Sequence, residues 1–306
     1  MNKEMASALV GKQKISLLIA DIKSLLKAGV LLANVLPVFS GFWLAIYFFN
    51  VSIVDYWGVF LLTMLGSTMV MAGALIINNW FDVDIDTVME RTKKRPTVTG
   101  HFTLRFVLLL GIILTAVGFI LLFFTTTEAV IYTFIGWFTY VVLYTMWSKR
   151  RYTFNTIIGS ISGAVSPLIG WTAVGSSLHT VPAILFLLLF IFQMPHTYAI
   201  AMRKHAEYKA AGVAMLPVTK GFLTAKKHIV FYVLCLLPLP FFLTQLGTVF
   251  IVLATILNVG WFLLAVYGLF IKDDLKWARW NFLYSVNYIM IIFLLMVIVT
   301  LPGYFK

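Results

Sequence analysis

The chain has 306 residues, of which 61% are hydrophobic and only 11% are charged, whereas typical globular domains contain about 45–50% apolar and about 25% charged residues. This composition excludes a soluble enzyme, a disordered tail and a fibrous repeat, and it predicts a membrane protein. The single cysteine, Cys235, lies in an apolar run, which excludes a disulfide framework, a CxxC redox pair and a cysteine-based zinc site.

The first 27 residues mix lysine and aspartate with leucine and isoleucine. This pattern predicts a cytoplasmic N-terminal interfacial segment over 1–27, followed by one transmembrane domain over 28–306. The segment has neither the short apolar stretch and cleavage site of a signal peptide nor the Arg- and Ser-rich composition of a transit peptide. We therefore expect a multi-pass protein of the plasma membrane, of bacterial origin, and a processed organellar protein is the alternative.

Seven long segments lack Asp, Glu, Lys and Arg, and each has at least the about 20 residues that a spanning helix needs. They are 28–54, 56–81, 106–127, 129–148, 152–202, 229–271 and 280–305. The two longest contain turn residues near 175–182 and 244–247, so each of them predicts two helices. The expected fold is therefore all-α with nine transmembrane helices, and eight or ten spans are the alternatives.

The net charge of +12 has a topological explanation. With the N-terminus inside, nine spans place every Lys and Arg except Lys306 in segments that face the cytoplasm, as the positive-inside rule requires. This bias supports both the number of spans and the orientation. It also leaves no support for nucleic acid as a partner.

Acidic residues gather in the segment 78–96, at the cytoplasmic end of the second span. At about 100° per residue, Asn78, Asp82 and Asp86 fall on one face of a helix. Carboxylates this close repel each other unless a cation neutralises them, and Mg²⁺ takes one or two carboxylates together with substrate phosphates. We predict that these three residues are catalytic and bind the metal. The alternative for a charge run alone is a solvated loop.

Basic residues follow directly. Arg91, Lys94 and Arg95 supply the guanidinium and ammonium donors that bind phosphate oxygens. Metal, acid and base in this order predict a diphosphate site. Lys149 and Arg150, at the inner end of the fourth span, are candidates for the same role, although topology explains them equally well.

A second polar group lies at the cytoplasmic end of the sixth span, with Gln193, His196 and Arg203, and then Glu207. Pro195 frees a backbone carbonyl and can bend this helix toward a cavity. Because the second and sixth spans both exit inwards, the two polar groups can share one cavity. For His196 alone, a hydrogen bond to a neighbour explains the residue as well as a function does.

A third polar group, which includes Tyr144 and Asn155, lies at the inner ends of the fourth and fifth spans. Glycines at 159, 163 and 170 in the fifth span predict close packing between helices. We assign these glycines no chemistry.

These motifs resemble those of the UbiA superfamily of intramembrane prenyltransferases. The spacing Asn78-xxx-Asp82-xxx-Asp86 looks like the first aspartate-rich motif of that superfamily. Further motifs resemble the branch that transfers a farnesyl group to protoheme IX. They are Tyr144-Thr-xxx-Lys149-Arg150, the segment 163–171, Gln193-x-Pro195-His196 and the segment 208–218.

The resemblance implies a fold, an activity and a set of ligands. It implies helices around a central cavity open to the cytoplasmic side, Mg²⁺ as cofactor, and farnesyl diphosphate and heme B as substrates. The farnesyl group would be transferred to a vinyl group of heme B, with addition of water, to give heme O for heme-copper oxidases. Association with a downstream heme-modifying enzyme is a further expectation.

The resemblance also implies roles for residues outside the first motif. Heme would contact His196, Gln193, Arg203 and Tyr144. Other superfamily members carry a second acidic pair after the sixth span, whereas this chain has only Glu207, where the branch usually has Asp. Glu207 is thus a further candidate metal ligand, but it does not by itself predict a second metal bound entirely by carboxylates.

Two rival functions remain. One is a prenyltransferase of the same superfamily that uses an aromatic acceptor for quinone synthesis. The other is a secondary transporter, because intramembrane acids also mark ion pathways. A transporter should carry its acids near the midplane on broken helices, whereas these acids lie at the inner mouth beside a basic cluster.

Overall fold

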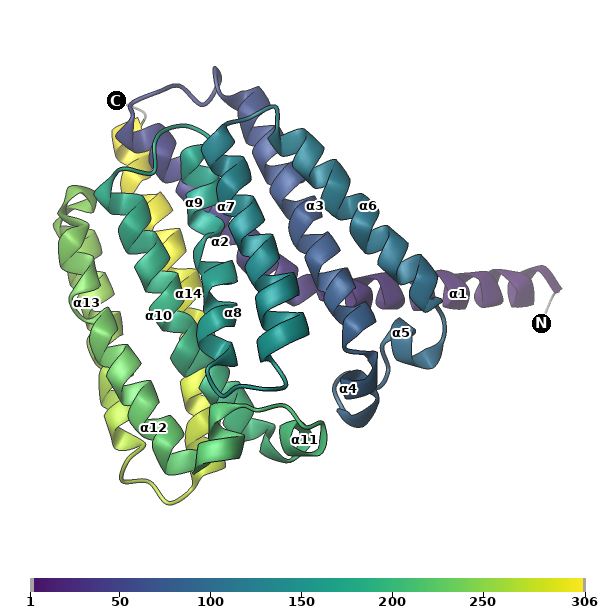
Figure 1. The fold of residues 1–306 in the computed structure, drawn as a ribbon. Coiled ribbons are helices and arrows are strands. Elements are labelled where there is room, and N and C mark those ends of the chain that lie inside the picture. The colour runs from purple at the N-terminus through teal and green to yellow at the C-terminus, as the bar shows by residue number, and fades with distance from the viewer. Residues whose placement is uncertain (1–2, 305–306) are drawn as a thin grey trace.

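The computed structural model describes residues 3–304 and, within them, the side chains of residues 14–301. Lys306, which the topology places outside, is not among the described residues, and neither are the side chains of Lys3 and Lys12. The described chain is helical throughout, without a strand (Figure 1). The helices of the first half are α1 Lys3–Leu25, α2 Ala28–Phe48, α3 Trp57–Phe81, α4 Val83–Val88, α5 Pro96–Thr99, α6 Leu104–Leu122, α7 Thr127–Phe138 and η1 Thr139–Ser148.

The second half begins with a broken helix and ends with the longest one. Its elements are α8 Asn155–Ala164, α9 Ser166–Thr172, α10 Thr180–Arg203, α11 His205–Ala210, α12 Leu216–Leu236, η2 Leu239–Phe242, η3 Thr244–Leu246, α13 Gly247–Tyr267 and α14 Asp274–Tyr304. The turns predicted near 175–182 and 244–247 are confirmed, because the chain reverses between α9 and α10 and again between α12 and α13.

The predicted count of nine spans is not confirmed. Within the described residues, eight helices are long and apolar enough to cross a membrane. The predicted fifth span is instead the pair α8 and α9, which meet at Val165. Pro167 lies at the start of α9, where it cannot donate a hydrogen bond to the preceding turn. The stretch is therefore two short helices rather than one long one.

Polar side chains define where several helices begin. The Thr126 hydroxyl accepts a hydrogen bond from the amide of Ala129 at 3.1 Å at the start of α7, and the Thr103 hydroxyl accepts one from Phe106 at 3.3 Å at the start of α6. Such caps satisfy amides that have no partner inside the helix. These helix starts are thus fixed by local sequence.

The charged segments share one end of the bundle. In Figure 1, α4, α5 and α11 lie at the lower end, together with the connections from η1 to α8 and from α13 to α14. These are the segments that the positive-inside rule assigns to the cytoplasm. The interfacial segment predicted over 1–27 contains the helix α1, which extends sideways from the bundle instead of crossing it.

The centre of the bundle is organised around α10. It packs against α8, α12 and α14, and the large side chains Trp171, Trp261 and Tyr288 are almost completely buried in the main core. The prediction of close glycine packing is confirmed at Gly170, where an added Cβ would overlap the carbonyl oxygen of Val38 on α2. The backbones of α2 and α9 therefore touch.

Candidate functional site

The predicted line of Asn78, Asp82 and Asp86 is formed at the junction of α3 and α4. Asp82 ends α3 and precedes α4. The helix is therefore interrupted at Asp82, whereas the sequence predicted one continuous helix through all three residues. Backbone hydrogen bonds of 2.9 Å from Asp82 to Asn78 and from Asp86 to Asp82 nevertheless preserve the four-residue spacing. All three side chains are buried.

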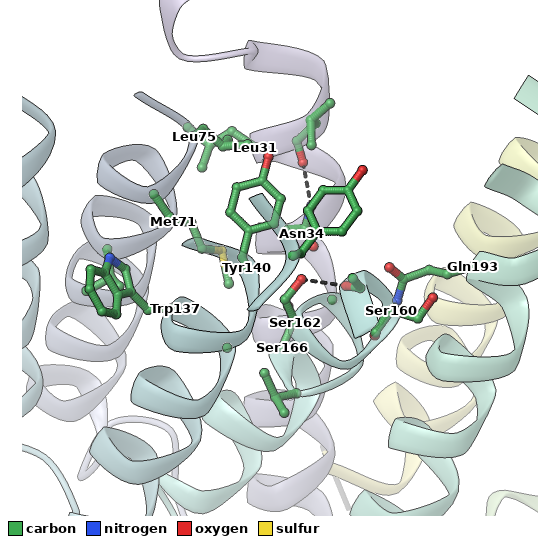
Figure 2. Close-up of a pocket in the computed structure, with 18 of the residues that line it drawn as sticks. Leu31, Asn34, Met71, Leu75, Trp137, Tyr140, Ser160, Ser162, Ser166 and Gln193 are labelled. Carbon is green, nitrogen blue, oxygen red and sulfur yellow. Dashed lines mark hydrogen bonds between the residues drawn. The ribbon is translucent and has the colours of Figure 1, made fainter. Parts of the chain in front are cut away.

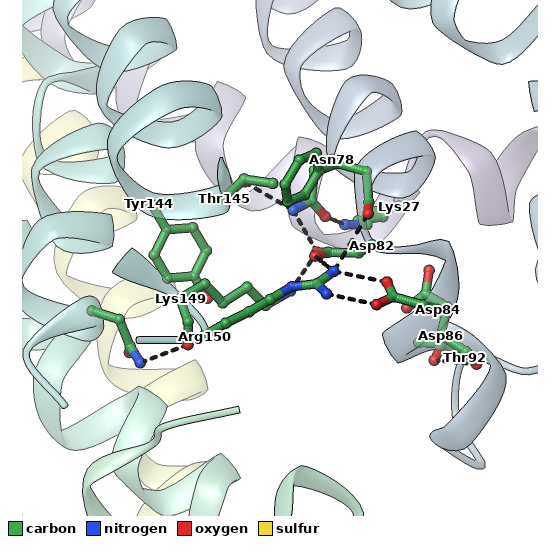
Figure 3. Close-up of polar contacts among 12 residues, drawn as sticks. Lys27, Asn78, Asp82, Asp84, Asp86, Thr92, Tyr144, Thr145, Lys149 and Arg150 are labelled. Carbon is green, nitrogen blue, oxygen red and sulfur yellow. Dashed lines mark hydrogen bonds and ion pairs between the residues drawn. The ribbon is translucent and has the colours of Figure 1, made fainter. Parts of the chain in front are cut away.

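Asp82 is the most enclosed acid of the site. One carboxylate oxygen, Oδ2, accepts a hydrogen bond from the Asn78 amide at 2.8 Å and another from the Lys149 ammonium group (Figure 3). The other oxygen, Oδ1, is buried and accepts no hydrogen bond from any described residue, although an Arg150 nitrogen lies 3.7 Å away. A buried carboxylate oxygen without a hydrogen bond is costly, so this atom is suited to a further cationic ligand.

Asp86 pairs with Arg95. The Arg95 Nη1 atom lies 2.5 Å from Asp86 Oδ2, and both side chains are largely buried. Thr92 donates a hydrogen bond of 3.1 Å to the backbone carbonyl of Asp86, which folds the basic loop back onto α4. Arg91 and Lys94 lie exposed on the same loop.

Arg150 and Asp84 form a two-pronged ion pair at the rim of the site, with N–O distances of 2.6 and 2.7 Å. The hydrogen bonds from Arg150 lower the pKa of Asp84 below its usual value, and the same bonds raise the pKa of Arg150. Asp84 is 61% exposed, so water screens this pair and it contributes little to folding. It links α4 to the end of η1.

The helix η1 has π-helical hydrogen bonding over Thr139–Ser148. It carries three residues of the site, and a fourth, Lys149, follows directly as its C-cap. π-helical turns are rare and occur often at functional sites. In an ordinary α-helix, Thr145 and Lys149 would lie about 140° and about 180° away from Tyr140. The wider turn instead brings residues four or five apart onto one face. Tyr140 and Tyr144 thus line a cavity, while Thr145 and Lys149 contact Asn78 and Asp82.

That cavity lies inside the bundle and has a volume of about 220 Å³ (Figure 2). Its wall comes from α2, α3, α7, η1, α8, α9 and α10. Apolar residues such as Leu31, Met71 and Trp137 are combined with a few polar ones, including Asn34 and Gln193. Ala74 is one helical turn from Asn78 on α3, so the charged cluster lies next to one end of the cavity.

The predicted heme residues are not all in this wall. Tyr144 and Gln193 line the cavity. His196 faces α14 instead, where its Nδ1 atom lies 2.7 Å from the Ser285 hydroxyl and its ring stacks on Phe192. Arg203 is exposed, and its guanidinium group lies 4.6 Å from the Phe282 ring centre.

Glu207, the further candidate metal ligand, lies on α11. One of its carboxylate oxygens accepts a hydrogen bond of 2.6 Å from Lys204. The other is buried and has no hydrogen-bond partner among the described residues. Burial raises the pKa of the neighbouring Tyr208. Tyr208 packs against the hydrophobic cluster that contains Ile85 and Met89, so α11 lies next to α4 and the site.

Sequence reasoning assigned Lys27 to topology alone and gave Thr145 no role. Lys27 donates a hydrogen bond to the Asn78 carbonyl oxygen, and the Asn78 amide donates one of 2.9 Å to the Thr145 hydroxyl. Burial lowers the pKa of Lys27 well below its usual value, and repulsion by Arg95 and Lys149 lowers it further. Lys27 precedes the first span by one position, and no local sequence signal distinguishes it from a topological lysine.

The oxygen donors of the site fit a hard cation. The described residues contain no group of three or more His, Cys, Asp and Glu side chains that could hold a metal, which excludes a cage built entirely from such residues. Mg²⁺ does not need one, because it usually keeps several waters and takes one or two carboxylates together with phosphate oxygens. Asp82 with its unsatisfied Oδ1, Asp86 and the Asn78 amide supply that donor set.

The fold and this arrangement define a class: a multi-pass helical membrane enzyme with a charged pocket at the end of an apolar cavity. The model of the UbiA prenyltransferase family matches residues 31–286, and the chain belongs to this family.

Relatives with high identity share one name. A protoheme IX farnesyltransferase of Oceanobacillus iheyensis is 53% identical over 297 residues, covering 97% of this chain and 95% of that protein. A protoheme IX farnesyltransferase of Bacillus cereus (strain G9842) is 50% identical and covers 92% of each chain.

Solved structures share the fold. The structure of a digeranylgeranylglyceryl phosphate synthase superposes with a TM-score of 0.73 at 20% identity, covering 93% of this chain and 99% of the other. A UbiA homologue from Archaeoglobus fulgidus, solved with DMAPP and Mg²⁺, superposes with a TM-score of 0.67 at 18% identity, covering 90% and 99%.

Proposed function

We propose that this protein transfers the farnesyl group of farnesyl diphosphate to a vinyl group of heme B, with addition of water, to give heme O. The observation that carries the proposal is the 53% identity to a protoheme IX farnesyltransferase over almost the whole chain. The geometry supports it, because an apolar cavity ends at a cluster of acids and bases. A farnesyl chain suits the apolar cavity, and a diphosphate suits the charged cluster.

The basic residues hold and orient the diphosphate. Lys149 and Arg95 reach the buried acids, and Arg150 stands at the rim with Asp84. Arg91 and Lys94 are exposed on the adjacent loop and can turn toward a bound anion. Guanidinium and ammonium groups in a partly buried site bind phosphate oxygens more strongly than in water.

Asp82, Asp86 and Asn78 would hold Mg²⁺, with Glu207 as a further candidate ligand. When bound, Mg²⁺ supplies charge stabilisation for the departing diphosphate. The protein otherwise acts by holding farnesyl diphosphate and heme B in position to react. The bond between farnesyl C1 and oxygen breaks, and its electron pair leaves with the diphosphate.

The vinyl π electrons of heme B then form the new carbon–carbon bond. Water captures the resulting cation and loses a proton, which leaves a hydroxyethylfarnesyl side chain. The apolar wall of the cavity, including Leu31, Met71 and Trp137, excludes water until the carbon–carbon bond has formed. Earlier hydration of the allylic cation would give only farnesol.

We place the active site at the cytoplasmic face of a bacterial plasma membrane. The charged loops lie together at one end of the bundle, and the positive-inside rule assigns that end to the cytoplasm. Farnesyl diphosphate, heme B and the bilayer are the proposed partners, and a downstream heme-modifying enzyme would receive the product. The acids lie at the end of α3, away from the midplane, which disfavours a transporter.

The test is reconstitution of the purified protein in lipid nanodiscs with farnesyl diphosphate, Mg²⁺ and heme B. We expect mass spectrometry to detect heme O, and we expect no prenylated product with a hydroxybenzoate or a naphthoate as acceptor. Transfer to either aromatic acid, without transfer to heme, would support the quinone-type alternative instead.

The proposed heme contact of His196 has its own test. His196→Ala should weaken heme binding in an absorption titration and leave farnesyl diphosphate binding nearly unchanged, because the imidazole would contact the iron or a propionate. Ser285→Ala is the matched control, since it removes the 2.7 Å contact and keeps the imidazole. An unchanged heme affinity and spectrum in His196→Ala would assign this residue to helix packing.

A further inference from the structure

Lys27 connects the first helix of the chain to the charged pocket. It lies between α1 and α2, and its ammonium group donates a hydrogen bond to the Asn78 carbonyl oxygen. The Asn78 amide nitrogen contacts Thr145 of η1 at 2.9 Å. Asn78 therefore lies between Lys27 on one side and η1 on the other (Figure 3).

The backbone at Lys27 is fixed in an unusual conformation. Its φ of 47° and ψ of 51° are left-handed, and Asn50 is the one other non-glycine residue with positive φ in the described chain. Such conformations persist only where the surroundings enforce them, and they cluster at functional sites.

The preceding residues are held firmly in place. The Asn79 side-chain amide donates a hydrogen bond of 2.7 Å to the Leu25 carbonyl, and Asp21 lies 2.9 Å from His101. Asn79 is completely buried, and Leu25 packs with Ile76. The neighbouring amides of α3 thus have separate tasks: Asn78 contacts the Lys27 side chain, and Asn79 holds the backbone that leads to it.

Basic side chains outnumber acidic ones around Lys27. Lys27, Arg95 and Lys149 are three basic side chains, whereas Asp82 and Asp86 are two acids. Arg150 is paired separately with Asp84. Charged groups that are removed from water need partners of opposite charge. Arg95 and Lys149 already contact the two acids, and Lys27 contacts only the neutral amide of Asn78, so Lys27 is the basic group that a bound anion would partner.

Lys27 also lies where the pocket meets the cavity. Leu31, one helical turn further along α2, and Asn34 both line the cavity wall. A ligand with its apolar tail in the cavity and its anionic head at Asp82 must pass the start of α2. Its head group would come within reach of the Lys27 ammonium group.

We propose that Lys27 is a further ligand of the substrate diphosphate and that Asn79 is the positioning residue that holds Lys27 in the pocket. This inference rests on the proposed function, because it assumes a prenyl diphosphate as the ligand. It gives α1 a task in substrate binding, in addition to that of a segment at the membrane surface.

The test compares two ligands that share a tail and differ in the head group. Calorimetric titration of the full protein in nanodiscs, with Mg²⁺ present, measures binding of farnesyl diphosphate and of farnesol. Lys27→Met should weaken diphosphate binding about ten- to hundredfold and leave farnesol binding unchanged. A loss of this size is typical when one hydrogen bond to a charged group is removed. Lys23→Met, at an exposed lysine one turn earlier, is the matched control and should bind both ligands normally.

A double-mutant cycle tests the positioning role of Asn79. Asn79→Leu removes the hydrogen bond to Leu25 and should weaken diphosphate binding by a smaller factor. The loss should disappear in the Lys27→Met background, because Asn79 would act only through Lys27. Fully additive losses would show that Asn79 supports the fold in some other way.

Three further results have distinct meanings. Equal diphosphate affinity in Lys27→Met and Lys23→Met would overturn the inference, and so would parallel losses of diphosphate and farnesol binding. If Lys27→Met does not insert, Lys27→Gln and Lys27→Arg provide the same comparison, and the arginine variant should retain most of the affinity. Failure of the unmodified protein to bind farnesyl diphosphate would refute the proposed function itself.

Discussion

Asp82→Asn and Asp86→Asn should each reduce prenyl transfer at least about 10²- to 10³-fold, the range observed when one group that stabilises the departing charge is removed. Each change keeps the shape of the side chain and removes one negative charge from the proposed Mg²⁺ site. In Asp82→Asn, the Lys149 ammonium group also loses its carboxylate partner. The measurement is heme O formation by the reconstituted variants, quantified by mass spectrometry.

The control for these variants is Asp55→Asn, which makes the same chemical change at an exposed residue just before the start of α3, the end of that helix opposite to Asp82. Its transfer rate should equal that of the unmodified protein. All three variants should insert into the membrane and elute as folded protein. Near-normal heme O formation by Asp82→Asn or Asp86→Asn at ordinary Mg²⁺ would remove the aspartates from the mechanism.

Gly41→Ala should strongly destabilise the folded protein. An added Cβ at Gly41 would overlap the backbone carbonyl oxygen of Pro167 on α9. A backbone atom cannot rotate away as a flexible side chain can, so α2 and α9 must separate. Overpacking of this kind costs about 1–3 kcal/mol and sometimes more. We expect less folded protein and a lower midpoint when detergent-solubilised samples are heated and the remaining monodisperse fraction is measured.

Gly29→Ala is the matched control on the same helix. No atom lies within 4 Å of the position of a Cβ at Gly29. Alanine is favoured over glycine in a helix by about 0.5–1 kcal/mol, so this variant should be as stable as the parent or slightly more so. If both variants melted at the same temperature, the contact between α2 and α9 would not limit stability.

The span count illustrates where apolar composition is informative. Runs without charge located the ends of the long helices, because the bilayer sets a minimum apolar length for each. Composition could not distinguish one continuous fifth helix from α8 and α9. That difference depends on the break at Val165 and the position of Pro167, which are matters of backbone geometry.

His196 shows the corresponding limit for side chains. The sequence places it one position after Pro195, near a cavity, but not on a known face of the helix. The structure turns Gln193 into the cavity wall and His196 toward Ser285 of α14. Packing against the neighbouring helices determines which side of α10 faces the cavity, and the sequence of α10 alone does not specify it.

The sequence by itself determined the class of protein and the spacing of Asn78, Asp82 and Asp86, because these follow from composition and from backbone periodicity. The orientation of the loops stays a prediction of the positive-inside rule. Tertiary structure decided which cations meet these acids. Lys149 reaches Asp82 because η1 is π-helical, and Lys27 reaches Asn78 because Asn79 fixes the end of α1. These contacts join residues 51 and 67 positions apart, and only the packing of several helices brings them together.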